Sequence, residues 1–128
     1  MSKDGEQVSE RTVLFVEDEP LIRMVGVELL SDAGYEVLEA ADAGEAMHIL
    51  EDSGEVQVLV TDIRMPGEMS GLELAAAVHD RWPRIKLLLT SGDTMLADSQ
   101  IPDSGHFLSK PYQAEDLRRE VRTLLASY

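Results

Sequence analysis

The chain has 128 residues, which is enough for one domain with a single buried core and leaves little room for a second. Its 11 basic and 25 acidic residues give a formal net charge of −14, which argues against binding of nucleic acid through a basic patch and suits a metal cation or a basic partner. The absence of cysteine excludes a disulfide scaffold, a cysteine-based zinc site and a cysteine nucleophile.

Residues 1–11 are polar and offer nothing to pack against a core, so we expect a flexible leader followed by one domain over residues 12–128. No apolar run approaches the roughly 18 residues that a membrane-spanning helix needs. We therefore expect a soluble, cytoplasmic protein that has no membrane partner.

The first half of the chain alternates strand and helix patterns. The apolar run Thr12–Val16 predicts a strand, and Pro20 suits the first position of the following helix because it lacks only an N–H that would be unpaired there. Gly34 is expected to close this helix, whose apolar residues recur at helical spacing: Ile22, Val25, Leu29 and Ala33. Residues 35–40 predict a second strand. Asp42 and Glu45 have the spacing of a capping box before a second helix.

The second half continues this alternation. The apolar run at residues 56–60 predicts a buried strand that stops at Asp62, before a Pro-Gly turn. Ser70 is a plausible cap for a third helix, and strands are expected at residues 85–89 and 106–109. Residues 92–104 suggest a short fourth helix among mobile turns. A last helix is predicted from its apolar stripe of Leu117, Val121, Leu124 and Leu125.

Five strands alternating with five helices predict an α/β fold, a doubly wound parallel sheet with helices on both faces. The ligand site of such a sheet lies outside the carboxyl ends of its strands, where the strand order reverses. The residues that fall at these ends are Glu17, Asp18, Asp62, Thr90 and Lys110.

When these residues share one crevice, they can bind a divalent cation and support phosphoryl transfer. Two like charges about 4 Å apart repel by on the order of 4 kcal/mol at an effective dielectric near 20, so a cluster of Glu17, Asp18 and Asp62 favours a divalent cation. Oxygen ligands of this kind are those that Mg²⁺ prefers. One carboxylate can then attack phosphorus as a nucleophile, while a lysine and a hydroxyl stabilise the phosphoryl oxygens.

In this order and spacing, the motifs resemble those of a response-regulator receiver domain over about residues 12–127. They are Glu17-Asp18, the Asp62 to Gly67 segment, Gly71-Leu72-Glu73-Leu74, Thr90-Ser91 and Lys110-Pro111. The resemblance implies a flavodoxin-like (βα)5 fold with strand order 2-1-3-4-5. It also implies a two-component signalling protein, here expected to be a single-domain type that has no output domain and catalyses only its own phosphorylation and dephosphorylation.

By the same resemblance, Asp62 is the phosphoacceptor, and its donor is a sensor histidine kinase or a histidine phosphotransfer protein. Asp18, Asp62 and the backbone carbonyl of Arg64 would bind Mg²⁺, with Glu17 acting through water. The downstream partner is an unidentified protein, no nucleic acid is expected, and the chain would be a monomer or a weak homodimer.

The resemblance further implies a conformational switch. Thr90 would move toward the phosphorylated aspartate, Lys110 would pair with the phosphoryl group, and Phe107 would turn inward. Pro111 would form a turn or a cis peptide bond after the lysine.

Some residues depart from the family's commonest pattern. Glu17 stands where many members carry aspartate, and Phe107 replaces a tyrosine. Gly71 lies 71 − 62 = 9 residues after Asp62, one more than a minimal loop needs. Arg64 places a cation beside the path of hydrolytic water, which leads to the hypothesis that it slows loss of the phosphoryl group.

Other functions compete with this interpretation. A receiver could act as a phosphate shuttle or sink in a multistep relay. A Mg²⁺-dependent phosphohydrolase with an aspartyl-phosphate intermediate is a second class, but a haloacid-dehalogenase-like enzyme would carry its nucleophile on the first strand and would need a longer chain. A flavin-binding module is a third, and Glu17-Asp18-Glu19 would repel the flavin phosphate.

Overall fold

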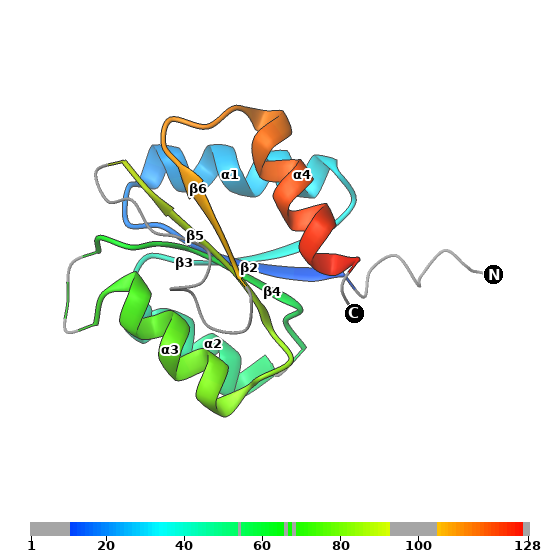
Figure 1. The fold of residues 1–128 in the computed structure, drawn as a ribbon. Coiled ribbons are helices and arrows are strands. Elements are labelled where there is room, and N and C mark those ends of the chain that lie inside the picture. Colours follow the sequence, from blue (N-terminus) through cyan, green and yellow to red (C-terminus); the bar gives the residue numbers. More distant parts are fainter. Residues whose placement is uncertain (1–10, 54, 66, 68, 93–104, 127–128) are drawn as a thin grey trace.

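The structure, a computed structural model, describes residues 11–53, 55–65, 67, 69–92 and 105–126. Five strands and four helices alternate along these residues (Figure 1). In chain order they are β2 (Thr12–Val16), α1 (Pro20–Asp32), β3 (Glu36–Ala40), α2 (Ala43–Ser53), β4 (Val58–Asp62), α3 (Gly71–Arg81), β5 (Lys86–Ser91), β6 (His106–Ser109) and α4 (Ala114–Leu125). The short helix expected within residues 92–104 and the leader expected at residues 1–11 lie outside the described residues, apart from residues 92 and 11.

All the strands belong to one parallel sheet in the order β3-β2-β4-β5-β6. Counted along the chain, this is the predicted order 2-1-3-4-5, which is therefore confirmed. The chain steps outward from β2 to β3, and then returns past β2 to β4. The strand order thus reverses between β2 and β4, and the carboxyl ends of these two strands flank the crevice where such sheets bind ligands.

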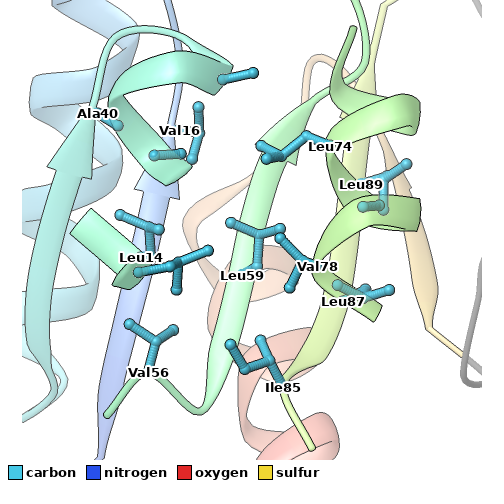
Figure 2. Packing of buried hydrophobic residues seen from close by; sticks show 14 of the residues in the cluster. Leu14, Val16, Ala40, Val56, Leu59, Leu74, Val78, Ile85, Leu87 and Leu89 are labelled. Atoms are coloured by element: carbon cyan, nitrogen blue, oxygen red, sulfur yellow. The ribbon is translucent and has the colours of Figure 1, made fainter. Parts of the chain in front are cut away.

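Helices cover both faces of the sheet, with α1 and α4 on one side and α2 and α3 on the other (Figure 1). Successive strand residues point to opposite faces, so each central strand supplies two separate cores. Leu14, Leu59 and Leu87 pack beneath α2 and α3 (Figure 2). Val13 and Leu88 pack on the opposite face, beneath α1 and α4. None of the helices in the described residues is long and apolar enough to cross a membrane.

Local sequence signals fix several helix ends. Pro20 begins α1, and Gly34 follows its end with a φ of +100°, a conformation that favours glycine. The amide of Glu45 donates to Asp42 Oδ1 over 2.8 Å at the start of α2. At the start of α3, Ser70 and Glu73 form a full capping box. These ends agree with the sequence predictions.

The apolar stripe that predicts α1 does not coincide with its buried face. Val25 is 53% exposed, whereas the buried positions of α1 are Gly26 and Leu30. A Cβ atom on Gly26 would lie 2.2 Å from Cζ of Phe15, so the helix backbone packs directly on that ring. The buried face of α1 is therefore centred on Gly26 and Leu30 rather than on the predicted stripe.

Candidate functional site

Neighbouring strands bring the polar residues predicted for the site to one edge of the sheet. β2 leads into Glu17 and Asp18, and β4 ends at Asp62. Asp62 lies directly beside Thr90 in the register of β4 and β5. β6 ends one residue before Lys110, whose amide donates to the last residue of β5 over 2.9 Å. Residues far apart in the chain therefore meet in one crevice because the strands are parallel and in register.

Lys110 contacts two of the carboxylates in this crevice. Its Nζ lies 2.9 Å from Oε1 of Glu17 and 3.2 Å from Oδ2 of Asp62. The exposed fractions of the three side chains are 19% for Lys110, 2% for Glu17 and 11% for Asp62. Because little water screens these charges, the ammonium offsets the repulsion between the two carboxylates.

Burial changes the acidity of both Glu17 and Lys110. It raises the pKa of Glu17 above its ordinary value of 4.5, although the hydrogen bonds from Lys110 and from the Glu19 amide oppose it. Burial lowers the pKa of Lys110, but the hydrogen bonds and charges of Glu17 and Asp62 outweigh it, so that this pKa is raised overall. Lys110 therefore stays charged at neutral pH. A cation that binds here competes with both this ammonium and a proton on Glu17.

The acidic residues fit a hard divalent cation. Carboxylate oxygens of Glu17, Asp18 and Asp62 all lie within 4.8 Å of one another. Oxygen-only donors at this separation suit Mg²⁺, which completes its octahedron with waters. Arg64, whose backbone carbonyl is the fourth predicted ligand, lies two residues beyond Asp62 and is exposed.

The structure also places the residues predicted to read out phosphorylation. Thr90 is buried, and its backbone carbonyl accepts the amide of Ile63 over 2.9 Å. Phe107 is half-buried on the edge strand β6, where it packs against the core beneath α2 and α3. The peptide bond between Lys110 and Pro111 is cis. Thr90 and Lys110 thus lie at the crevice, and Phe107 lies three residues before the lysine.

Two residues shape the site in ways that the sequence interpretation did not predict. Gly71 begins α3 so close to β4 that a Cβ atom on it would lie 1.8 Å from the carbonyl oxygen of Asp62. Arg23 of α1 donates from Nη1 to the backbone carbonyl of Glu17 over 2.7 Å. The family motif includes Gly71 only as a pattern, and nothing local marks Arg23.

An apolar surface adjoins the crevice. The exposed fractions on α1 are 71% for Leu21 and 57% for Met24, which is unusual for large apolar side chains that lie close together. A pocket of about 550 Å³ lies between α1 and the segment after β6, lined by Leu21, Ile22, Val25, Gly92, Lys110, Pro111 and Tyr112. Lys110 lines this pocket and also contacts Glu17 and Asp62. The pocket and the acidic cluster are therefore parts of one continuous surface.

Comparisons with known proteins agree with this geometry. The sequence pattern of the response regulator receiver domain matches residues 13–122. The receiver protein CpdR of Brucella abortus is 33% identical over 118 residues, which cover 90% of this chain and 97% of CpdR. The sensor kinase CckA of the same organism is 39% identical over 118 residues, but the match covers 89% of this chain and only 12% of CckA.

A solved structure shows the same arrangement. The response regulator TrrA of Thermotoga maritima, in complex with Mg²⁺ and BeF, superposes with a TM-score of 0.76 at 29% identity, covering 89% of this chain and 98% of TrrA. The family pattern and the structural similarity both extend over nearly the whole chain. The chain belongs to the response regulator receiver domain family, a family of signalling domains.

Proposed function

We propose that Asp62 accepts a phosphoryl group from a phosphohistidine in a Mg²⁺-dependent reaction, and that the phosphorylated chain changes the surface it offers to a partner protein. The observation that carries this proposal is the cluster at the carboxyl edge of the sheet. It joins Asp62 to Glu17 and Asp18 within 4.8 Å and to Lys110 at 3.2 Å.

The proposed transfer makes one bond and breaks one. A carboxylate oxygen of Asp62 attacks phosphorus, the bond from phosphorus to the donor's imidazole nitrogen breaks, and its electron pair remains on that nitrogen. Glu17, Asp18, Asp62 and the Arg64 carbonyl would hold Mg²⁺, which supplies positive charge opposite the phosphoryl oxygens. The complex of TrrA with Mg²⁺ and BeF supports this assignment by similarity.

Lys110 and Thr90 would respond to the new group. Lys110 already lies within hydrogen-bond distance of Asp62, so a short movement of Nζ would exchange the carboxylate for a phosphoryl oxygen. Thr90 lies beside Asp62 on the next strand, where its hydroxyl could donate to a second oxygen. In this proposal Thr90 moves toward the phosphoryl group, and Phe107 turns into the space beside it.

The apolar surface of α1 supports a protein donor. Leu21 lines the pocket beside the crevice, and both Leu21 and Met24 are mostly exposed, so a donor that presents an apolar helix face could cover them while its histidine reaches Asp62. We infer that a histidine kinase or a histidine phosphotransfer protein docks there. A Leu21→Glu variant should then accept phosphate from acetyl phosphate normally and from a phosphorylated kinase slowly.

The first test is the intact mass after incubation with acetyl phosphate and Mg²⁺. The wild-type chain should gain one phosphoryl group, whereas Asp62→Asn and a chelated wild-type sample should gain none. A gain by Asp62→Asn at the wild-type rate would contradict the assignment of Asp62. Release of inorganic phosphate from small phosphoesters at a high turnover would instead favour the phosphohydrolase.

A further inference from the structure

Arg23 connects the acidic loop to two other parts of the fold. From the second turn of α1, its Nη1 donates to the backbone carbonyl of Glu17 over 2.7 Å, and its Nε lies 3.2 Å from Oε1 of Glu39 on β3. The exposed fraction of the Arg23 side chain is 21%, against 55% for that of Glu39. The arginine side chain is therefore mostly covered, and its two contacts use different nitrogens of the guanidinium.

The carbonyl that accepts this bond belongs to the peptide group between Glu17 and Asp18. A peptide group is planar, so fixing its carbonyl oxygen also fixes the direction in which the chain enters Asp18. On the other side of Glu17, its own amide donates to the carbonyl of Ala40 over 3.1 Å. The peptide groups before and after Glu17 are thus both held, the first by β3 and the second by Arg23.

The Glu39 contact keeps the guanidinium in place. Glu39 comes one residue before Ala40 on β3, so the same strand binds the Glu17 amide and the arginine. A planar guanidinium with several N–H donors can serve a carbonyl and a carboxylate at once, which the single ammonium of lysine does less well. Arg23 therefore links α1, the acidic loop and β3 through one rigid group.

We propose that Arg23 is a positioning residue for the metal site: it orients the Glu17–Asp18 peptide group so that both carboxylates face the crevice beside Asp62. The inference rests on the proposed function, because it assumes that these carboxylates hold Mg²⁺. Groups that orient metal ligands typically change metal affinity by about 10–100-fold when they are removed.

The sign of the effect separates positioning from charge. A guanidinium near the site repels a divalent cation, so an arginine that acted by its charge alone would weaken Mg²⁺ binding, and its removal would strengthen it. If Arg23 positions the carboxylates, its removal weakens Mg²⁺ binding even though a positive charge is lost. The two roles therefore predict opposite shifts in the dissociation constant.

The test is a calorimetric titration of the full chain with Mg²⁺. Arg23→Ala should weaken binding by about tenfold. Arg23→Lys, which keeps the charge but not the planar fork, should weaken it less. Glu39→Gln removes the charge of an exposed carboxylate but keeps an oxygen that can accept from Nε of Arg23, so the dissociation constant of Mg²⁺ for this variant should stay within about twofold of the wild-type value. Unchanged or tighter binding by Arg23→Ala would overturn the proposal.

A matched variant separates positioning from a general loss of stability. Arg81 forms a comparable exposed ion pair with Glu51 at 2.9 Å, at the end of α3 farthest from the β4 carboxyl end. Arg81→Ala should lower the urea midpoint of the chelated protein slightly and leave Mg²⁺ binding unchanged. In NMR spectra recorded without metal, the amide resonances of Asp18 and Glu19 in Arg23→Ala should differ in position from those of the wild type. Wild-type resonances at these two positions would overturn the inference.

The outcomes also distinguish this inference from the proposed function. A wild-type chain that binds Mg²⁺ and gains a phosphoryl group, together with an Arg23→Ala variant of equal affinity, overturns the positioning role alone. A wild-type chain that binds no Mg²⁺ overturns both. If Arg23→Ala does not fold, Arg23→Lys decides: weaker Mg²⁺ binding than in the wild type supports the positioning role, and wild-type affinity overturns it.

Discussion

Nζ of Lys110 lies 2.9 Å from Oε1 of Glu17. The segment after β6, the last strand in the chain, therefore meets the segment after β2, the first strand in the chain. The contact spans 93 residues of sequence and is largely shielded from water. The lysine lies where its charge can neutralise Glu17 and Asp62 together. Metal binding and the lysine contact are therefore competing ways of balancing the same negative charge.

Replacing Lys110 with glutamine should have opposite effects on stability and on metal affinity. The free energy of unfolding without metal should fall by about 3 kcal/mol, because two buried carboxylates lose their counter-charge. Mg²⁺ should bind severalfold more tightly, because a competing cation is gone. Urea unfolding in chelator and calorimetric titration measure the two effects.

The control for Lys110→Gln is Arg119→Gln, which breaks an exposed ion pair of 3.0 Å with Asp116. Such an exposed pair contributes little to stability, and it lies on α4 rather than in the crevice. The Mg²⁺ affinity of Arg119→Gln should match that of the wild type. Weaker Mg²⁺ binding by Lys110→Gln would show that the lysine supports the metal site instead of competing with it.

The raised pKa of Glu17 predicts a pH dependence of stability without metal. Between its ordinary value of 4.5 and its higher value in the folded chain, the folded state binds more protons at this carboxyl than the unfolded state does. The free energy of unfolding therefore falls as the pH rises through that window. Glu17→Gln should lack this contribution, so its stability relative to the wild type should increase from acidic to neutral pH.

Urea unfolding of both proteins in chelator, across the mildly acidic range, checks this sign. Comparing the slopes cancels the constant offset that arises because glutamine contacts Lys110 differently. A difference between the two proteins that is independent of pH would mean that Glu17 titrates alike in the folded and unfolded states. Adding Mg²⁺ should remove the effect, because a metal-bound carboxylate does not take up a proton.

The sheet was predictable because its signals are local and repeat. Each central strand is a short apolar run with a polar residue after it, and Ser70 is a plausible helix cap in the sequence alone, to which the structure adds the reciprocal bond with Glu73. The parallel direction of the strands then follows from connections that are long enough for a crossover. Asp62, Glu17 and Lys110 could be grouped for the same reason, since parallel strands place their carboxyl ends on one edge.

What the sequence did not reveal depends on close approach between elements. The outward direction of Val25 follows from the packing of Gly26 on Phe15, which no periodicity within α1 encodes. The bond from Arg23 to the Glu17 carbonyl likewise depends on how α1 sits over the acidic loop. An arginine at helical spacing looks the same whether it faces solvent or a backbone oxygen.

Arg64 should lengthen the life of the phosphorylated state. Its exposed side chain follows Asp62 by two residues, where a long cation can obstruct the approach of hydrolytic water. Arg64→Ala should lose the phosphoryl group about tenfold faster, which corresponds to about 1.4 kcal/mol in the barrier. The rate of this loss is measured by intact mass, as the decline of the phosphorylated fraction after acetyl phosphate is removed. Arg84→Ala, an exposed arginine at the amino end of β5, is the control. Equal lifetimes for wild type and Arg64→Ala would refute this role.

Gly71 should be intolerant of even one added carbon. A Cβ atom there would lie 1.8 Å from the carbonyl oxygen of Asp62. The amide of Gly71 already donates to the carbonyl oxygen of Ile63 over 2.8 Å. Gly71→Ala must therefore move α3 or the end of β4, at a cost of about 1–3 kcal/mol in stability. Because the displaced backbone carries Asp62, the rate of phosphoryl gain from acetyl phosphate should fall as well.

Gly44→Ala is the matched control for this substitution. Its added carbon would lie 3.5 Å from Oδ1 of Asp42, an ordinary contact, and alanine is favoured over glycine within α2 by up to about 1 kcal/mol. This variant should be as stable as the wild type or slightly more so, and should gain a phosphoryl group at the wild-type rate. If Gly71→Ala behaved in the same way in urea unfolding and in intact-mass kinetics, the contact with Asp62 would not constrain the site. A loss of stability without a slower reaction would confine its effect to packing.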